Sequence, residues 1–599
     1  MSVPSVGDAS LDQLVQQWLS LDQNPKTRKE ITDLVEAGNK AELHTRLDAR
    51  MEFGTAGLRA AMAAGYSRMN DVTIIQTAQG FARYVEDVQP DAKSMGVAIG
   101  YDARHNSQRW AQLSALALVA RGIKVYLFSA ICPTPFVPFA VCKYKTAAGV
   151  MVTASHNPKN DNGYKVYWGN GAQIISPHDK GIASHIEENL QPWPTAWDVS
   201  ALESNDAFRA LVVDPLAEVT ASYMDAIREH SIEGSPRDAI KITYTAMHGV
   251  GLEFAMKAYE TFGLPPFVQV AEQVHPDPEF PTVKFPNPEE GKSALDLSIR
   301  TANANDSPVI VANDPDADRL AVAERRPDGS WKIFTGNEIA TIFAGWLLQQ
   351  YLKTHADAKN AACVASTVSS KFLKRMAEVE GCYFEETLTG FKWIGNKVIE
   401  LHAAGRDIIM SFEEAIGFSV GTVVFDKDGV CASAVMGLIA NDLYSRGSTL
   451  MQQLEALYLK YGYFASLNSY YLCYSQPTIQ KIFQRIRKDE QYPTSCGGVA
   501  IRHVRDLTTG YDNSKPGNKA TLPTSSSSQM VTFTFENGAV ITIRTSGTEP
   551  KIKYYTELRG DASSVEDFAK VEQDLKALVE AVVKDMLQPE ENGLIPKSD

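Results

Sequence analysis

Clustered cysteines are missing from this 599-residue sequence. It has seven cysteines, an odd number, and no two of them form a CxxC pair. This spacing excludes a disulfide framework and a cysteine-ligated zinc site, and it is typical of a reducing compartment. The N-terminus has no basic segment followed by an apolar one, and no apolar run reaches about 18 residues. We therefore expect a soluble, cytoplasmic protein without a signal peptide or a membrane span.

An excess of positive charge is also lacking. The net charge is −14 at pH 7, which argues against a nucleic-acid-binding surface. It does not exclude anionic substrates, because local basic clusters can override the global sign. The sequence is 44% hydrophobic and 22% charged, as in ordinary globular proteins. Its length predicts roughly four domains.

Buried strands alternate with helices along most of the chain, which predicts parallel α/β sheets. We expect a helix at 10–20, capped by Ser10, and another at 107–120. The last part differs, because apolar residues alternate with threonines around Asn537-Gly538, a strong hairpin signal. A capping box from Ser563 to Glu566 predicts a final helix. The sequence thus predicts three α/β domains at 1–205, 206–334 and 335–460, followed by a smaller α+β domain at 461–599.

A serine follows the apolar run at 147–152, which predicts a buried strand. The next residues read TASHNP, and the Asn-Pro pair and Asn162-Gly163 indicate a loop. Ser155 would therefore lie at the carboxyl end of a strand, where open α/β sheets bind their ligands. A lone serine of this kind is usually a surface residue in a polar turn. The neighbouring His156 and Lys165 favour a functional site instead.

Three aspartates alternate directly after the strand predicted at 309–312. Asp314, Asp316 and Asp318 are followed by Arg319, and carboxylates at every second position can converge on one hard cation. Crowding them without a metal would be unfavourable. An EF-hand is excluded, because Arg319 and Arg325 stand where that loop needs glycine and glutamate. An acidic turn and a phosphatase with an aspartate nucleophile stay open as alternatives.

Anion donors gather in a second loop, near the C-terminus. Arg544, Ser546, Gly547 and Thr548 follow a predicted strand, and together they fit a phosphate dianion better than a carboxylate. A plain hydrophilic turn is the alternative. The segment FGTAGLR, which ends at Arg59, is a weaker candidate of the same kind.

Two more loops follow predicted elements of the third α/β domain. One contains Thr389 and Gly390 and ends at Lys392. The other contains Glu413, and its paired glutamates could hold sugar hydroxyls. A solvated acidic turn is equally compatible with that segment.

Two anion-binding loops, a cation site and a serine together indicate phosphoryl transfer. Ser155 is not in a G-x-S-x-G elbow, which disfavours acyl transfer. Phosphoryl transfer depends on positioning and charge neutralisation more than on a strong base. We expect Ser155 to carry the group as a phosphoserine, and the Arg544 loop to hold the other phosphate of the substrate.

In these loops the sequence resembles the α-D-phosphohexomutase superfamily. TASHNPKNDNGYK resembles its active-serine loop, DPDADR its metal loop, FEEAIG its sugar-binding loop and RTSGTEPK its phosphate-binding loop. The resemblance covers nearly the whole chain and implies four domains around a central cleft. It also implies Mg²⁺, a bisphosphorylated sugar intermediate, and glucose 1,6-bisphosphate or ribose 1,5-bisphosphate as primer.

The resemblance assigns a role to each loop residue by its position. Ser155 would carry the phosphoryl group and, with the three aspartates of the metal loop, bind Mg²⁺. Lys392 would act as the acid/base. The other residues would line the transfer site (Arg59, His156, Lys165), contact the substrate (Arg319, Thr389, Gly390, Glu413) or bind the distal phosphate (Arg544, Ser546, Gly547, Thr548).

Two departures from the common pattern indicate a branch of the superfamily. Phe412 and Ala415 stand where many hexomutases have glycine and serine in the sugar loop, and the metal loop reads Asp-Pro-Asp instead of Asp-Gly-Asp. We interpret Phe412 as added bulk at the sugar and Ala415 as a lost hydroxyl. Both features resemble the branch of phosphopentomutase and phosphoglucomutase-2.

That branch interconverts the 1- and 5-phosphates of ribose and deoxyribose and, less preferentially, glucose 1- and 6-phosphate. A sister activity makes glucose 1,6-bisphosphate from 1,3-bisphosphoglycerate, and this alternative stays open, as does a regulatory protein that binds sugar phosphates without turnover. We expect small phosphosugars as partners, no nucleic acid or membrane, and a monomer or weak homodimer.

Overall fold

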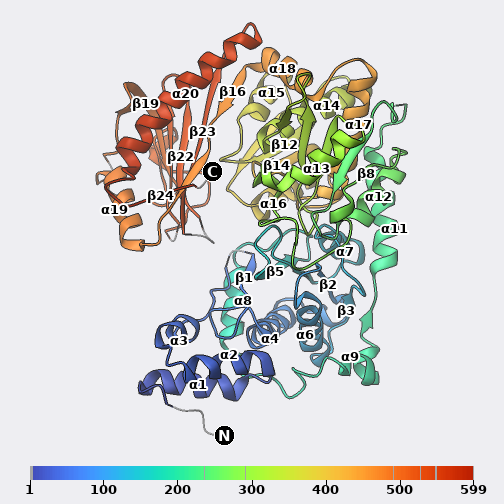
Figure 1. Ribbon diagram of the computed structural model, residues 1–599, viewed down its shortest axis with the longest axis vertical. Helices are drawn as coiled ribbons and strands as arrows, with labels where there is room; N and C mark the ends of the chain where they lie inside the picture. Colours follow the sequence, from blue (N-terminus) through green and yellow to red (C-terminus); the bar gives the residue numbers. More distant parts are fainter. Residues whose placement is uncertain are drawn as a thin grey trace. The chain divides into compact units, whose positions relative to one another are not determined.

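The computed structural model describes residues 5–54, 56–234, 236–290, 292–489, 491–526, 528–546 and 550–597. The chain forms two compact units (Figure 1). The first contains Met1–Phe343 and Gly390–Thr449, and the second contains Ala344–Thr389 and Leu450–Asp599. Within the described ranges, no helix combines the length and the apolar character needed to cross a membrane.

Three helices open the first unit and lie side by side (Figure 1): α1 (Ala9–Leu21), α2 (Pro25–Glu36) and α3 (Lys40–Leu47). They bury their own apolar cluster, which includes Leu11, Trp18 and Leu43. The helix predicted at 10–20 is therefore confirmed, but its cap was assigned wrongly. The Asp8 carboxylate, not Ser10, accepts the first free amide hydrogens of α1, because a carboxylate at the cap position also complements the helix dipole.

The first sheet of this unit has six strands in the order β1-β5-β4-β2-β3-β6. Four strands are parallel to one another, namely β2 (Val97–Tyr101), β3 (Val125–Leu127), β4 (Ala148–Val152) and β6 (Val212–Val213). Strand β5 (Asp161–Trp168) runs antiparallel to β4, and the edge strand β1 (Gly57–Ala61) runs antiparallel to β5. The sheet is thus mixed, and the prediction of a purely parallel sheet was wrong at this edge.

Asn162-Gly163 was predicted to mark a loop, but it lies inside β5. The glycine is there for close approach: a Cβ at Gly163 would lie 2.5 Å from the carbonyl oxygen of Thr153. Helices cover this sheet, and α4 packs against α6 and α8. The helices of this region are α4 (Asp71–Val88), α5 (Ala92–Met95), α6 (Ser107–Ala120), α7 (Phe136–Tyr144), α8 (His178–Glu187), α9 (Ala201–Ser204) and α10 (Asp206–Arg209).

The second sheet of the first unit has the order β11-β10-β9-β7-β8. Its parallel strands are β7 (Ile242–Thr245), β8 (Val268–Gln269) and β9 (Val309–Ala312), and its antiparallel strands are β10 (Ala321–Arg325) and β11 (Trp331–Ile333). The helices α11 (Leu216–Ile227), α12 (Gly251–Thr261) and α13 (Lys292–Ala304) belong to this region. Because β9 ends at Ala312, the metal loop begins at the carboxyl end of a central strand, as predicted.

The rest of the first unit comes from a later stretch of chain. It contains α16 (Phe391–Ala403), the antiparallel pair β14 (Asp407–Glu413) and β15 (Gly417–Val420), and α17 (Gly429–Ser445). Helix α17 packs against α12 and β15. The α14 helix (Gly336–Thr354) leads the chain out of the first unit.

In the second unit, the parallel strands β12 (Ala361–Ser366) and β13 (Tyr383–Thr387) are followed along the chain by an antiparallel sheet. That sheet contains β17 (Ser469–Leu472), β19 (Val499–Asp506), β21 (Met530–Phe535), β22 (Val540–Thr545) and β23 (Lys551–Gly560), and shorter strands β16 (Tyr463–Ser466), β18 (Ser495–Cys496), β20 (Tyr511–Asp512) and β24 (Ile595–Pro596). The helices are α15 (Phe372–Glu380), α18 (Leu450–Tyr461), α19 (Gln476–Arg487) and α20 (Phe568–Val582).

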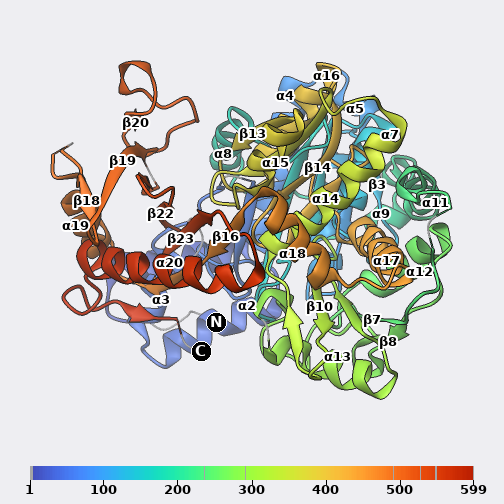
Figure 2. The same ribbon diagram turned by 90° about the horizontal axis from the view of Figure 1, so that it is seen from above.

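Helix α20 lies along β23 and β16 (Figure 2). The hairpin predicted at Asn537-Gly538 joins β21 to β22, as expected. The predicted capping box was one residue early, because Ser564 and Asp567 form it. Along the chain, three α/β regions are followed by an antiparallel sheet with helices, which confirms the predicted fold class.

Candidate active site

Ser155 lies just beyond the end of β4, in the first unit. Its residue is only 2% exposed, and its backbone has φ of +53°, a left-handed conformation that costs a non-glycine residue roughly 1–2 kcal/mol. The hydroxyl donates a hydrogen bond to the Asp314 carboxylate at 2.7 Å. The active-serine loop and the metal loop, 159 residues apart in sequence, therefore meet at this hydroxyl.

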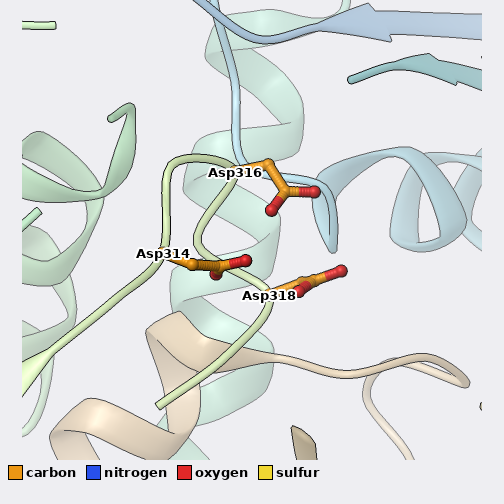
Figure 3. Close-up of side chains that lie close together, drawn as sticks. All are labelled: Asp314, Asp316 and Asp318. Carbon is orange, nitrogen blue, oxygen red and sulfur yellow. The ribbon is translucent and has the colours of Figure 1, made fainter. Parts of the chain in front are cut away.

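The three aspartates of the metal loop lie close together, with their carboxylates on the same side of the loop (Figure 3). One ligand oxygen from each of Asp314, Asp316 and Asp318 lies within 4.8 Å of the other two, and all three residues are fully buried. Burial, together with the charges of Asp316 and Asp318, raises the pKa of Asp314 well above its usual value. Three buried carboxylates this close repel one another, so the loop needs positive charge.

Two buried lysines supply part of that charge. The Lys165 ammonium lies 2.8 Å from the Asp316 carboxylate and 2.9 Å from the Asp318 carboxylate. The Lys427 ammonium lies 3.4 Å from Asp318 and 3.3 Å from Asp426. Burial lowers the pKa of Lys427, but the charges of Asp318 and Asp426 outweigh it, and the pKa is raised.

The residues of this cluster fit a divalent cation. One carboxylate oxygen of Asp316 and one of Asp318 are buried without a hydrogen-bond partner, and such atoms are rare unless something else satisfies them. Hard oxygen ligands in this number suit Mg²⁺. Asp314, Asp316 and Asp318 would hold the ion, and Mg²⁺ there would neutralise charge on a phosphoryl group at Ser155.

Two glycines let neighbouring segments approach the metal loop closely. A Cβ at Gly249, just before α12, would lie 2.3 Å from the Cα of Pro315. A Cβ at Gly429, the first residue of α17, would lie 2.4 Å from the carbonyl oxygen of Arg319. The backbone of the loop is therefore held on two sides by segments that tolerate no side chain.

The other predicted residues of the serine site lie around this cluster. The Arg59 guanidinium, on β1, donates to the side-chain oxygen of Asn157 in the serine loop at 3.1 Å. His156 Nδ1 lies 3.2 Å from the Ser155 hydroxyl. Burial, followed by the positive charges of Arg319 and Arg59, lowers the pKa of His156 well below its usual value. The structure thus brings Arg59, His156 and Lys165 to one place, as predicted.

The metal loop is joined directly to the loop that contains Glu413. The amide of Leu320 donates to the carbonyl of Ile416 at 3.0 Å, and Arg319 pairs with Gly417 in an antiparallel bridge. Burial raises the pKa of Glu413, although the nearby charges of Lys427 and Arg319 oppose this shift. Glu413 and Arg319 therefore belong to the same site.

The position of Phe412 contradicts the role predicted for it. The interpretation that it adds bulk at the sugar was wrong, because Phe412 is fully buried and its ring is stacked with Phe418 on the neighbouring strand. Side chains alternate across a strand, so Phe412 and Glu413 must point to opposite faces. Ala415 is half-buried, and only this substitution can bear on the sugar.

Lys392 lies in the first turn of α16, after Gly390, whose φ is +100°. Burial lowers the pKa of Lys392 to about 8, against an opposing contribution from Asp179. A lysine with this pKa can accept or donate a proton near neutral pH. This property suits the acid/base role expected for it.

Part of the predicted phosphate-binding loop lies in the second unit. The Arg544 guanidinium, near the end of β22, donates to the hydroxyl of Thr389. The structure thus brings together two residues that the sequence placed in separate loops. The amide of Ser546 donates to the carbonyl of Lys551, whereas Gly547 and Thr548 lie outside the described residues.

Sequence reasoning missed several residues that support the site. Thr134 donates from its hydroxyl to Asp316 at 2.6 Å, and Arg104 donates to the carbonyl of Ser155 at 2.6 Å. Lys427 is the third. Its signal was the Asp-Lys-Asp triplet at 426–428, a run of charge between two apolar segments.

The site can hold a phosphoryl group on a buried hydroxyl and neutralise its charge. The hydroxyl of Ser155 is next to oxygen ligands for a cation and to buried cations, which is what phosphoryl transfer requires. An acidic turn exposed to solvent is inconsistent with three fully buried aspartates. A serine that donates to one of these aspartates also disfavours a phosphatase in which an aspartate is the nucleophile.

Four family models match the chain in succession. They are described as phosphoglucomutase/phosphomannomutase alpha/beta/alpha domains I, II and III and the C-terminal domain of the same family. They match residues 50–193, 221–329, 335–461 and 502–575. Together they span most of the sequence in the predicted order.

Curated proteins are similar over almost the full length. A human protein named glucose 1,6-bisphosphate synthase and a human protein named phosphopentomutase are each 49% identical over 606 residues, which covers 99% of this chain and 97% or 98% of theirs. A phosphoribomutase from Saccharomyces cerevisiae is 42% identical over 90% of this chain and 91% of its own.

A solved structure has the same fold. The open form of parafusin, a phosphoglucomutase from Paramecium, matches with a TM-score of 0.65 and 18% identity, over 91% of this chain and 97% of its own.

Proposed function

This chain belongs to the α-D-phosphohexomutase superfamily, and on that premise we propose that it interconverts the 1- and 5-phosphates of ribose and deoxyribose through a phosphoserine at Ser155. Glucose 1- and 6-phosphate would be poorer substrates. The observation that carries the proposal is the hydrogen bond of 2.7 Å between the Ser155 hydroxyl and Asp314. This hydrogen bond supports the proposal because the hydroxyl that would carry the group lies beside three carboxylates that could bind Mg²⁺.

The reaction would proceed by two transfers. In the first, the bond between phosphorus and the Ser155 oxygen breaks as a sugar hydroxyl oxygen bonds to phosphorus, and that hydroxyl loses its proton to a base. Lys392, whose pKa is about 8, is the residue we assign as this base. The serine oxygen released in this transfer would take up a proton. The sugar bisphosphate would then reorient, and in the second transfer the Ser155 oxygen would bond to the phosphorus of the other phosphate and lose that proton. The bond between this phosphorus and the sugar oxygen would break, and Lys392, protonated in the first transfer, would donate a proton to the released sugar oxygen.

The remaining residues would bind and orient the sugar phosphate. Arg59, His156 and Lys165 would surround the transferred group, and Arg319 and Glu413 would contact the sugar. Arg544 with Thr389, and the rest of that loop (Ser546, Gly547, Thr548), would hold the distal phosphate, with Gly390 leading into the Lys392 helix. A bisphosphate, either glucose 1,6-bisphosphate or ribose 1,5-bisphosphate, would prime Ser155.

Pentose preference rests on the relatives. Proteins named phosphopentomutase or phosphoribomutase occur among similar chains from mammals and from two yeasts, at 42–49% identity. The loss of a hydroxyl at Ala415 agrees with a smaller sugar, but one methyl group does not set a substrate ratio.

Glucose 1,6-bisphosphate synthesis from 1,3-bisphosphoglycerate is the second candidate. The specific observation in its favour is that relatives named for this activity are also 49% identical over 606 residues. The same serine and cation cluster would serve both reactions, because they differ in the donor that phosphorylates Ser155.

One set of assays separates the two. Purified protein with Mg²⁺ is given ribose 1-phosphate or glucose 1-phosphate with glucose 1,6-bisphosphate as primer, and in parallel glucose 1-phosphate with 1,3-bisphosphoglycerate. We expect the highest kcat/KM with ribose 1-phosphate. A synthase rate well above both mutase rates would replace the proposal by the second candidate.

Ser155→Ala is the control for all three reactions. Turnover by wild type that is lost in this variant excludes a binding protein without catalysis.

We further propose that the protein works in the cytoplasm as a monomer or weak homodimer, with four domains bounded near residues 205, 334 and 460.

A further inference from the structure

The backbone of the active-serine loop is held by a closed ring of hydrogen bonds and one ion pair. The Ser155 amide donates to the Thr153 hydroxyl at 2.9 Å, and that hydroxyl donates to the Asp102 carboxylate at 2.6 Å. Asp102 forms an ion pair with Arg104 at 3.4 Å, and Arg104 donates to the carbonyl of Ser155 at 2.6 Å. Both polar groups of the Ser155 backbone are therefore fixed through Asp102 and Arg104.

Arg104 holds more of the loop than Ser155. Its two terminal nitrogens also donate to the carbonyls of Asn157 at 2.6 Å, Pro158 at 2.9 Å and Asp161 at 3.1 Å. Its side chain is 1% exposed. Only the planar, five-donor guanidinium group can serve four carbonyls in fixed directions, and an ammonium group cannot.

Such support is needed because the conformation of Ser155 is unfavourable by itself. A serine with φ of +53° stays there only when the surrounding structure determines it. If the loop relaxed to φ below zero, the direction of the hydroxyl would change. Its hydrogen bond to Asp314 would then be lost.

A residue from the segment that follows β8 covers the guanidinium group. Phe280, in the segment between β8 and α13, is 4% exposed, and the centre of its ring lies 5.0 Å from the Cζ of Arg104. Its own φ is +45°, and its amide donates to the carbonyl of Asp277 at 3.1 Å. Asp277 is tied in turn to the carbonyl of His248 at 2.9 Å. Phe280 is thus presented to Arg104 by an ordered turn.

The same turn reaches the serine loop at a second point. The Glu279 carboxylate lies 2.6 Å from the Lys159 ammonium and 2.6 Å from His105 Nε2. These groups are about half exposed, so their contribution to stability is small. Through Glu279, the turn at 277–280 therefore contacts both the residue after Arg104 and the serine loop that Arg104 holds.

We propose that Arg104 is a positioning residue for the Ser155 hydroxyl and that Phe280 fixes Arg104. This inference rests on the proposed function, in which Ser155 carries the phosphoryl group. The hydrogen bonds of the Arg104 guanidinium run to backbone carbonyls of the serine loop, and its ion pair is with Asp102, so Arg104 acts on the Ser155 hydroxyl through the loop backbone. The turn at 277–280 therefore belongs to the machinery of the first transfer, although it lies between β8 and α13, far from the serine loop in sequence.

The first test replaces Arg104 by lysine. This substitution keeps the positive charge opposite Asp102 but removes the planar guanidinium group that donates to four carbonyls. The readout is the rate of Ser155 phosphorylation after mixing with glucose 1,6-bisphosphate, followed by intact mass spectrometry. We expect a fall of about 10²-fold, the cost of a reacting group displaced by about 1 Å. In steady state kcat should fall while KM for the sugar phosphate changes little.

The second test guards against misfolding of the Arg104 variant. Phe280→Leu removes the ring from a loop position, and Phe285→Leu, a change at a 46% exposed residue in the same segment, is its matched control. We expect slower Ser155 phosphorylation in Phe280→Leu, with a thermal unfolding midpoint close to that of wild type, and no change in Phe285→Leu. In Arg104→Ala, added guanidinium ion should restore part of the rate.

Clear outcomes would overturn the proposal. They are folded Arg104→Lys and Phe280→Leu proteins that phosphorylate Ser155 at the wild-type rate, or variants in which only KM rises. Failure of the proposed function looks different. Wild type would then lack phosphoserine altogether, or would form it and transfer it to a hexose only, and the second result leaves the role of Arg104 intact.

Discussion

Lys165→Met gives the most direct measure of the charge balance at the metal loop. Lys165 is 8% exposed, and its ammonium group lies 2.8 Å from the Asp316 carboxylate and 2.9 Å from the Asp318 carboxylate. Methionine keeps much of the buried volume but removes the charge. After the substitution Asp316 keeps the Thr134 hydroxyl and Asp318 keeps the Lys427 ammonium, so only Asp316 loses its cation completely.

The size of the effect follows from these contacts. A hydrogen bond to a charged group contributes about 1.5–3 kcal/mol, and breaking one partner out of a buried ion pair costs about 3–5 kcal/mol. Because Lys427 still serves Asp318, we expect the lower end, about 3 kcal/mol. For a domain of about 200 residues this corresponds to a fall in the thermal midpoint of roughly 6–12 °C.

Mg²⁺ should reverse most of this loss. A cation that binds only the folded state at a hundred times its Kd stabilises by about 2.7 kcal/mol. It should bind the variant more tightly than wild type, because Lys165 no longer occupies oxygens of Asp316 and Asp318. The midpoint of Lys165→Met should therefore rise more on addition of Mg²⁺ than that of wild type.

The assay is calorimetric unfolding of both proteins in EDTA and in excess Mg²⁺. Lys159→Met is the matched control, since Lys159 lies six residues before Lys165, just ahead of β5, but forms a half-exposed pair with Glu279, worth about 0–1 kcal/mol. Equal midpoints for Lys165→Met and wild type in EDTA would refute the reasoning. So would a Mg²⁺ shift of the same size in both.

Four shorter predictions concern the reaction. Ser155→Ala should form no phosphoenzyme and transfer nothing while unfolding at the wild-type temperature; mass spectrometry and calorimetry check this, and residual turnover would refute it. Asp316→Asn should raise the Mg²⁺ concentration needed for half-maximal rate, and an unchanged requirement would refute the cation assignment. Arg544→Ala should raise KM about 10–100-fold, from the loss of a charge-assisted hydrogen bond of about 1.5–3 kcal/mol to the distal phosphate; unchanged kinetics would exclude that role. Because we assign the neutral Lys392 amine as the base, and its pKa is lowered to about 8, we expect kcat/KM to rise with pH through about 8 and then level off. Lys392→Met should lose that rise, and a variant that keeps it would show that another group titrates.

The fold class and the carboxylate cluster could be predicted because their signals are local. An apolar strand followed by alternating aspartates fixes three carboxylates in five residues, and the structure brings those of Asp314, Asp316 and Asp318 together. The same holds for Ser155 after β4. In both cases the chain itself sets the geometry, at the carboxyl end of a strand.

The residues that sequence reasoning missed act across long separations. Lys427 meets the metal loop about a hundred residues after it, and Thr134 meets Asp316 across 182 residues. Nothing near Lys427 in the sequence shows which carboxylate it will face. Phe412 was misread for a different reason. A substitution was assigned to the sugar before the face of its strand was known, and the alternation of side chains places it in the core.

The two glycines beside the metal loop, Gly249 and Gly429, are positions at which substitution would disturb the loop. Any side chain at Gly249 or Gly429 would collide with the loop backbone, so descendants of this sequence inherit the same carboxylate geometry or lose the site. Ala415 in the neighbouring loop is only half-buried, so part of its surroundings is open to solvent. Sugar preference can therefore drift in small steps while the phosphoryl chemistry stays constant. A library aimed at new sugars should vary the loop around Ala415 and leave both glycines untouched.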